Sequence, residues 1–313
     1  MPTQTLEDIR SNGLLQCLFQ PIYSICEQQI LGYEALSRGP EDSPLFTPLQ
    51  LFAAARETAQ LCELDSFCRQ LACSRFRQLQ LQGLLFLNVS PESLLDPEHK
   101  PGRTLKLIDS LGLCPSNVVI ELTEHAPGQD FALLEKALRH YRAMGFRIAL
   151  DDLGSGFSSL RLWSELRPDY VKIDRHFIQG IHQDAVKREF VSSIVKMAGA
   201  SRAQVIVEGV EQREELTTLI NLGVDLVQGF LLCKPQAFPP LQAGDILTQL
   251  LPPADTPPVA EKPLLSLLLQ QSGVNQGAQI NDVLQRFHQQ ANLNSLVVLD
   301  SKGRPVGIVH RQP

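Results

Sequence analysis

The chain has 313 residues, of which 43% are hydrophobic and 20% are charged, and its formal net charge is −6. This composition is typical of a globular protein and excludes a disordered or fibrous chain. The acidic balance also excludes a broad basic surface that would hold a nucleic-acid duplex by its phosphates. A small anionic ligand would need local positive charge or metal ions.

The seven cysteines are odd in number and include no C-x-x-C pair, so we expect reduced thiols in a cytoplasmic protein. Residues 1–10 lack the basic and apolar segments of a signal peptide, and the longest apolar runs, such as residues 264–269, are too short to span a bilayer. We therefore expect no membrane insertion by this chain.

Prolines mark one domain boundary. Five of the 21 prolines fall at positions 252, 253, 257, 258 and 263, which predicts an extended linker over residues 251–263. Residues 1–250 then form one unit, and residues 264–313 are too few to bury a large core.

Short apolar runs alternate with stretches of helical period in residues 1–250, which indicates repeated βα units and a parallel sheet. One such stretch carries Leu133, Leu134, Ala137, Leu138 and Tyr141 on a single helix face. The expected strands are residues 30–33, 84–87, 118–120, 147–150, 170–173, 204–207 and 226–227.

Every expected strand is followed by a polar side chain. One such residue could simply begin a loop or cap a helix, but seven in succession predict a shared site. In a closed (β/α)8 barrel all the carboxyl ends of the strands meet at one face. Length, strand count and period favour this α/β barrel over a doubly wound open sheet, whose ligands lie in one crevice. The residues are Glu34, Asn88, Glu121, Asp151 with Asp152, Lys172 with Asp174, Glu208 and Gln228.

That many carboxylates on one face need compensating cations. Oxygen ligands without histidine or cysteine favour Mg²⁺ or Mn²⁺ over zinc. The adjacent Asp151 and Asp152 could share two ions, the arrangement that activates water in phosphoester cleavage.

Lys172 is either a salt-bridge partner among these carboxylates or a group that orients the attacking water. Asp174 is a helix N-cap or a ligand, with the N-cap favoured. Residues 151–160, DDLGSGFSSL, form a plain turn or a mobile catalytic loop, and the position beside the two aspartates favours the loop.

Residues 19–235 resemble the bacterial EAL-domain phosphodiesterases, which hydrolyse cyclic di-GMP to linear pGpG. A three-letter EAL match alone would carry no weight, but the whole ordered set of motifs is highly specific. The set is FQP (19–21), GYEALSR (32–38), LNVS (87–90), IELTE (120–124), ALDDLGSGFSSL (149–160), VKID (171–174), VEGVE (207–211) and QGF (228–230).

The resemblance implies roles for individual residues. Glu34, Asn88, Glu121 and Asp151 match ligands of a first Mg²⁺ or Mn²⁺ ion, and Asp151 with Asp152 matches the bridge to a second. Lys172 matches a lysine that contacts the nucleophilic water, and Glu208 a glutamate described as general base or second-ion ligand. Glu211 matches a glutamate that supports the site, and Glu124 matches the residue that holds the loop after Asp152. Gln20 and Arg38 match contacts to the cyclic dinucleotide, and Gln228 matches a position on the rim of the substrate pocket.

Family members commonly have Phe and Thr where this chain has Leu153 and Ser155. These two departures put loop rigidity and dimer coupling in question, but not metal binding. Family members also tend to dimerise near this loop, so the resemblance implies a homodimer.

Residues 279–311 predict a helix, a strand, an Asp-Ser-Lys-Gly turn and a second strand. This pattern is similar to about half of a tandem CBS module, which implies an adenine nucleotide as a possible ligand of a completed module. We expect the chain to be part of a longer regulatory protein. The alternative is a C-terminal extension that packs on the barrel.

Two other functions are weighed against a phosphodiesterase. A cyclic di-GMP receptor would be expected to have lost metal ligands, whereas none is replaced here. A barrel glycosidase would use two carboxylates but would leave Asn88, Lys172 and the paired aspartates unexplained.

Overall fold

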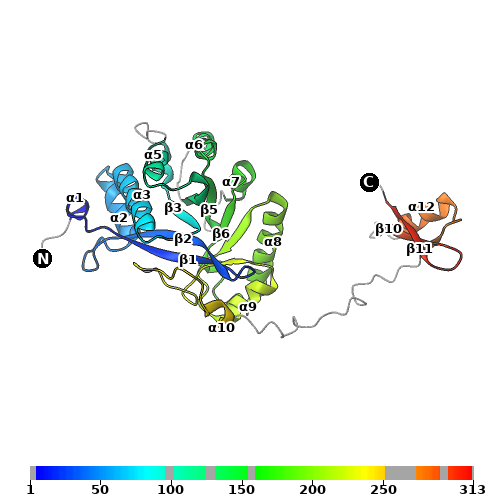
Figure 1. Cartoon of the computed structure of the whole chain (residues 1–313). Helices are drawn as coiled ribbons and strands as arrows, with labels where there is room; N and C mark the ends of the chain where they lie inside the picture. Colours follow the sequence, from blue (N-terminus) through cyan, green and yellow to red (C-terminus); the bar gives the residue numbers. More distant parts are fainter. Residues whose placement is uncertain are drawn as a thin grey trace. The chain divides into compact units, whose positions relative to one another are not determined.

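The computed structural model describes residues 5–95, 102–123, 131–153, 159–250, 273–289 and 295–311. The chain divides into two compact units, Met1–Pro252 and Pro253–Pro313. In the first unit eight strands form a closed barrel in chain order, and helices surround it (Figure 1). The predicted barrel is therefore confirmed.

The barrel strands are β1 (Gln16–Ser24), β2 (Gln29–Arg38), β3 (Leu84–Asn88), β4 (Val118–Thr123), β5 (Arg147–Leu153), β6 (Tyr170–Ile173), β7 (Gln204–Val207) and β8 (Leu226–Val227). The α-helices of this unit are α1 (Leu6–Ser11), α2 (Pro48–Glu57), α3 (Leu61–Gln78), α4 (Pro91–Leu95), α5 (Arg103–Ser110), α6 (Phe131–Ala143), α7 (Ser159–Leu166), α8 (Ala185–Ser201), α9 (Arg213–Asn221) and α10 (Ile246–Leu250). Two 3₁₀ turns, η1 (Pro115–Asn117) and η2 (Arg175–Phe177), complete it.

The first strand departs from the expected all-parallel sheet. The sequence did not predict β1, which pairs antiparallel with both β2 and β8, whereas every pairing from β2 to β8 is parallel. The short connection between Ser24 and Gln29 permits only a hairpin, because a parallel crossover needs a dozen or more residues. As a result, the beginning of β1, not its end, lies at the carboxyl-end face of the other strands.

Apolar side chains that alternate along the strands fill the barrel interior. Gly32 lies at this layer on β2, where an added Cβ would come within 2.2 Å of the Leu84 carbonyl oxygen, so no other residue fits there without a shift of the backbone. The interior cluster consists of Ile22, Leu84, Phe86, Val119, Ala149, Tyr170, Ile206 and Leu226, with Leu31 packed against it.

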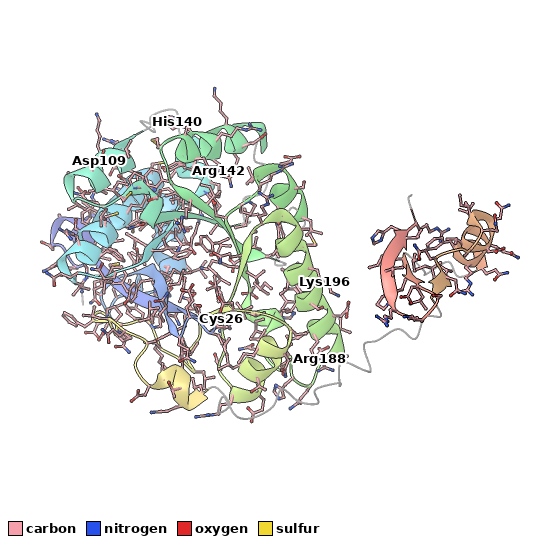
Figure 2. The ribbon with its side chains drawn as sticks, turned by 45° about the vertical axis from the view of Figure 1, so that its right-hand side comes forward. Cys26, Asp109, His140, Arg142, Arg188 and Lys196 are labelled. Atoms are coloured by element: carbon pink, nitrogen blue, oxygen red, sulfur yellow. The ribbon has the colours of Figure 1, made fainter. Side chains whose placement is uncertain are left out.

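A larger apolar core lies between the strands and the helices. The predicted helix face is part of it, because Leu134, Leu138 and Tyr141 of α6 are buried. Arg142, labelled in Figure 2, links α6 to α7 by donating to the Leu166 carbonyl at 2.6 Å. The helices are therefore held by apolar packing on the barrel and by polar contacts at their ends.

The second unit is a three-stranded sheet with one described helix. Its elements are β9 (Val274–Asn275), α12 (Ile280–Gln289), β10 (Ser295–Leu299) and β11 (Pro305–His310), in the sheet order β11-β10-β9. The predicted helix and antiparallel hairpin are confirmed, and the Asp300 carboxylate accepts the Lys302 and Arg304 N–H groups in the turn. The sequence did not predict β9, which pairs parallel with β10.

Within the described ranges, no helix combines the length and apolar character that crossing a membrane requires.

Candidate functional site

The polar residues predicted at the strand ends continue the interior layer of the barrel. Successive side chains of a strand point to opposite faces, so a residue two positions after an interior residue also faces inward. On β3, for example, Asn88 follows Phe86, and on β6 Lys172 follows Tyr170. The structure brings seven of the predicted residues together in this way: Glu34, Asn88, Glu121, Asp151, Lys172, Glu208 and Gln228.

Lys172 lies at the centre of this group and has no solvent exposure. Its Nζ is 2.6 Å from Glu208 Oε1 and 2.8 Å from Glu121 Oε1. The same atom is 3.3 Å from Glu34 Oε2 and 3.4 Å from Asp151 Oδ1. One cation thus faces four carboxylates, which leaves an excess of negative charge at the base of the site.

These contacts shift the pKa values of the group. Burial alone would lower the pKa of Lys172, but Asp151, Glu121, Glu208 and Glu34 raise it well above its usual value. Burial raises the pKa of Glu208 to about 8, although Lys172 opposes that shift. Burial also raises the pKa of Glu121 and of Asp151, again against the effect of Lys172. Without further cations, Glu208 therefore favours its protonated form near neutral pH.

The two adjacent aspartates depart from regular strand geometry. Asp152 has a left-handed backbone with φ of 56°, and the pairing register between β5 and β6 shifts between Leu150 and Leu153. Aspartate is among the few residues that tolerate this conformation. In a regular strand Asp151 and Asp152 would point to opposite faces. Here both contribute carboxylate oxygens that lie within 4.8 Å of one another and of Glu208.

The carboxylates form two overlapping groups that could hold divalent ions. Glu34, Glu121 and Asp151 form the first, and Asp151, Asp152 and Glu208 form the second, each with oxygens within 4.8 Å of one another. Asp151 belongs to both. The donors are hard oxygens and the local charge is negative, so the residues fit Mg²⁺ or Mn²⁺.

Amide side chains orient the first group. Asn88 Nδ2 donates to Glu34 Oε1 at 3.2 Å, so its amide oxygen points away from that carboxylate. Gln228, which is 2% exposed, donates through Nε2 to Glu34 Oε2 at 3.0 Å. Gln20 pairs with Glu34 across the β1–β2 ladder and donates to the Cys233 carbonyl at 2.9 Å. Arg38 lies half-buried at the end of β2.

Some predicted residues lie apart from this group or outside the described ranges. The Glu211 side chain is exposed, and its backbone N–H donates to Glu215 Oε2 at 3.0 Å. Asp174 caps η2 by accepting the His176 N–H at 2.8 Å, in line with the favoured N-cap interpretation. Glu124 and half of the expected loop 151–160, namely residues 154–158, lie outside the described residues.

A cavity of about 410 Å³ opens beside the carboxylates, between β2, β3 and the helices α2 and α3. Its lining includes the polar Glu34, Asn88 and Asp152 and the apolar Leu49 and Phe52. The cavity wall also contains the buried Asp65 and Arg69, which were not predicted from the sequence. The signal that could have found them is their position, since both charges stand on the apolar face of α3 with Leu61, Leu64, Cys68 and Ala72.

Comparisons with known proteins place this site in a family. RocR of Pseudomonas aeruginosa, described as a cyclic di-GMP phosphodiesterase, is 32% identical over 232 residues, which cover 72% of this chain and 58% of RocR. PdeI of Escherichia coli, described as a probable cyclic di-GMP phosphodiesterase, is 32% identical over 240 residues, or 72% of this chain and 29% of PdeI. The chain thus spans only part of the length of these relatives.

Solved structures agree with the sequence matches. A manganese and cyclic di-GMP complex of Klebsiella pneumoniae BlrP1 has a TM-score of 0.66 at 31% identity and covers 71% of this chain and 56% of that one. A standalone EAL protein of Vibrio cholerae with bound c-di-GMP has a TM-score of 0.65 at 29% identity, and the match covers 71% of this chain and 92% of that one. Residues 3–235 match the family described as the EAL domain, so this chain belongs to the EAL domain family.

Proposed function

We propose that the chain is a cyclic di-GMP phosphodiesterase that hydrolyses its substrate to linear pGpG with two divalent ions, Mg²⁺ or Mn²⁺. The observation that carries this proposal is that two sets of three carboxylate residues, each able to hold an ion, have Asp151 in common. A shared carboxylate suits two ions that act on one phosphodiester. The names of RocR and PdeI and the ligands of the BlrP1 complex support the same substrate and metal class.

The substrate would bind across the cavity and the carboxylates. Arg38 stands at the end of β2, and its guanidinium is the natural partner of a phosphate. Gln20 pairs with Glu34 across the β1–β2 ladder and Gln228 donates to Glu34, so both side chains would lie beside the bound dinucleotide. Leu49 and Phe52 give the cavity an apolar wall for a base. Because the acidic site would repel a bis-phosphate, bound cations are needed for binding as well as for turnover.

Glu34, Asn88, Glu121 and Asp151 would hold one ion, and Asp151 with Asp152 would bridge to the second. When bound, the ions supply an activated water and stabilise the leaving oxygen. Glu208 would take the proton of the attacking water, or bind the second ion. Lys172 would orient that water and offset charge in the transition state. Glu211 and Glu124 would support the site and the loop after Asp152.

The direct test is product analysis. The purified chain is incubated with cyclic di-GMP and Mg²⁺ or Mn²⁺, with a chelated control, and the products are separated by ion-exchange chromatography. Appearance of pGpG only in the presence of metal is expected. Binding of cyclic di-GMP without product would instead favour a receptor. Failure to bind it would refute the assignment of cyclic di-GMP as the substrate.

Location and assembly extend the proposal. All seven cysteines lie in the described residues and none of them forms a disulfide bond, which supports a reducing, cytoplasmic location. We also propose that the chain forms a homodimer. Light scattering during size-exclusion chromatography tests this, because it measures whether the molar mass is that of one chain or of two.

The C-terminal unit has its own cavity of about 860 Å³, lined by Val274, Phe287 and Val298 among others. Its apolar wall would suit the base of an adenine nucleotide in a completed CBS-like module. Equilibrium dialysis of the chain with AMP and ATP tests this part of the proposal.

A further inference from the structure

A buried ion pair lies on α3 beside the carboxylate site. Asp65 is 1% exposed and Arg69 is 5% exposed, and the Arg69 guanidinium donates to Asp65 Oδ2 one helical turn away. A buried ion pair is weak evidence of a stabilising role, because apolar residues of similar volume often serve stability as well or better. A role beyond stability would lie in a further hydrogen bond that Asp65 makes among the described residues.

That contact is with the chain that leaves β3. Asp65 Oδ1 accepts the backbone N–H of Ser90 at 3.4 Å, two residues beyond Asn88. The Val89 N–H donates to the Glu121 carbonyl at 3.0 Å and so continues the ladder between β3 and β4. At Ser90 the ladder has ended and α4 begins, with Ser90 Oγ accepting the Ser93 N–H at 3.1 Å. Asp65 is thus the hydrogen-bond partner of this backbone at the first residue after the ladder.

The pair also lines the cavity that Asn88 lines. Asp65, Arg69, Asn88 and Ser90 line the same cavity of about 410 Å³. Arg69 fixes one oxygen of the Asp65 carboxylate, which leaves the other directed at the Ser90 N–H. The Asp65 carboxylate therefore holds the turn after Asn88, and the buried Arg69 guanidinium holds the orientation of that carboxylate.

We propose that Asp65, oriented by Arg69, is a positioning residue that fixes the turn after β3 and thereby holds Asn88 beside the carboxylates of the metal site. This inference rests on the proposed function, which assigns Asn88 to the first ion. Groups that orient metal ligands through hydrogen bonds commonly change metal affinity or activity by about 10–100-fold when removed. Loss of the Ser90 contact should act in the same way.

Two double variants isolate the contact. Asp65→Asn with Arg69→Met removes both charges but keeps an amide oxygen for the Ser90 N–H. Asp65→Leu with Arg69→Met removes both charges and the acceptor. The readouts are the Mn²⁺ dissociation constant, from the electron paramagnetic resonance signal of free Mn²⁺, and kcat and KM for cyclic di-GMP. We expect the leucine variant to bind Mn²⁺ about 10-fold more weakly than the asparagine variant.

A matched control separates positioning from general destabilisation. The Asp225 carboxylate accepts the N–H of Cys26, labelled in Figure 2, at 2.7 Å, so it also anchors a loop, but at the opposite end of the barrel. Asp225→Ala should lower the melting temperature and leave the Mn²⁺ dissociation constant unchanged. Equal Mn²⁺ affinity in the two double variants, or an equal loss in Asp225→Ala, would overturn the positioning role.

If the leucine variant does not fold, a measurement on the wild-type chain still tests the Ser90 contact. Hydrogen exchange of the Ser90 amide should be slow in the wild type and in the asparagine variant, because both offer an acceptor. Rapid exchange in the wild type would overturn the proposal. Failure of the wild type to bind Mn²⁺ at all would instead refute the metal site itself, so the two failures are distinguishable.

Discussion

Lys172 Nζ and Glu208 Oε1 lie 2.6 Å apart at the base of the barrel site, where the lysine has no solvent exposure. Three further carboxylates face the same ammonium, so Lys172 is the cation that offsets their mutual repulsion in the metal-free protein. This arrangement predicts how the folding stability of the protein depends on metal binding and on pH.

Lys172→Met should destabilise the metal-free protein, because it leaves the surrounding carboxylates without their buried cation. Removing one partner of a buried ion pair typically costs about 3–5 kcal/mol of folding free energy. We expect a melting temperature lower by about 5 °C or more, and a smaller difference with saturating Mn²⁺. Lys196→Met on the exposed side of α8 is the control and should melt like the wild type. An unchanged melting temperature for Lys172→Met would contradict the balancing role.

Mn²⁺ binding should release protons and tighten as pH rises from 6 to 8. Burial raises the pKa of Glu208 to about 8, so this side chain of the metal-free site holds a proton at neutral pH. Burial also raises the pKa of Glu121 and Asp151. Ligands must lose these protons before they bind metal. Isothermal titration calorimetry at pH 7 in two buffers of different ionisation enthalpy measures the release. Equal heats in both buffers would be incompatible with it.

The same pKa shifts give the metal-free protein a pH-dependent stability. A carboxyl whose pKa is raised on folding contributes stability that is present below its usual pKa and is lost as pH rises through the folded value. For Glu208 the loss extends from about 4.5 to about 8. Thermal denaturation should therefore show a lower melting temperature at pH 8 than at pH 6. The stabilisation by Mn²⁺ should be larger at pH 8.

The barrel and most of its site could be predicted from local sequence pattern. In several strands an interior apolar residue is followed two positions later by a polar one, as in Phe86 and Asn88 or Tyr170 and Lys172. This short pattern predicts both the strand and the site residue at its end. Because the strands converge on one face, residues far apart in the chain needed no further information to be grouped.

The features that could not be predicted depend on contacts beyond one strand. The antiparallel direction of β1 follows from a hairpin connection. The left-handed backbone at Asp152, which turns its carboxylate toward Asp151, leaves no distinct pattern in the sequence. Asp65 and Arg69 reach the site only because α3 packs beside the end of β3.

Glu34→Ala should abolish most turnover and leave the fold intact. Glu34 accepts hydrogen bonds from Asn88 and Gln228 and lies 3.3 Å from Lys172, so its loss removes a proposed ion ligand and also relieves repulsion among the carboxylates. We expect kcat to fall at least about 100-fold with little change in melting temperature. Asp109→Ala, an exposed change on α5, is the control and should keep wild-type kinetics. A Glu34→Ala rate equal to wild type at saturating Mn²⁺ would refute the ligand assignment.

Two substitutions at Asp152 should separate its backbone from its carboxylate. Asp152→Gly and Asp152→Ala both remove the carboxylate, so both should lower turnover to a similar level. Glycine adopts φ of 56° without the steric cost of a Cβ, whereas that conformation costs alanine about 1 kcal/mol. We therefore expect the glycine variant to melt about 2–4 °C above the alanine variant. If the alanine variant were as stable as the glycine variant, the left-handed backbone at Asp152 would not be a feature that the fold imposes.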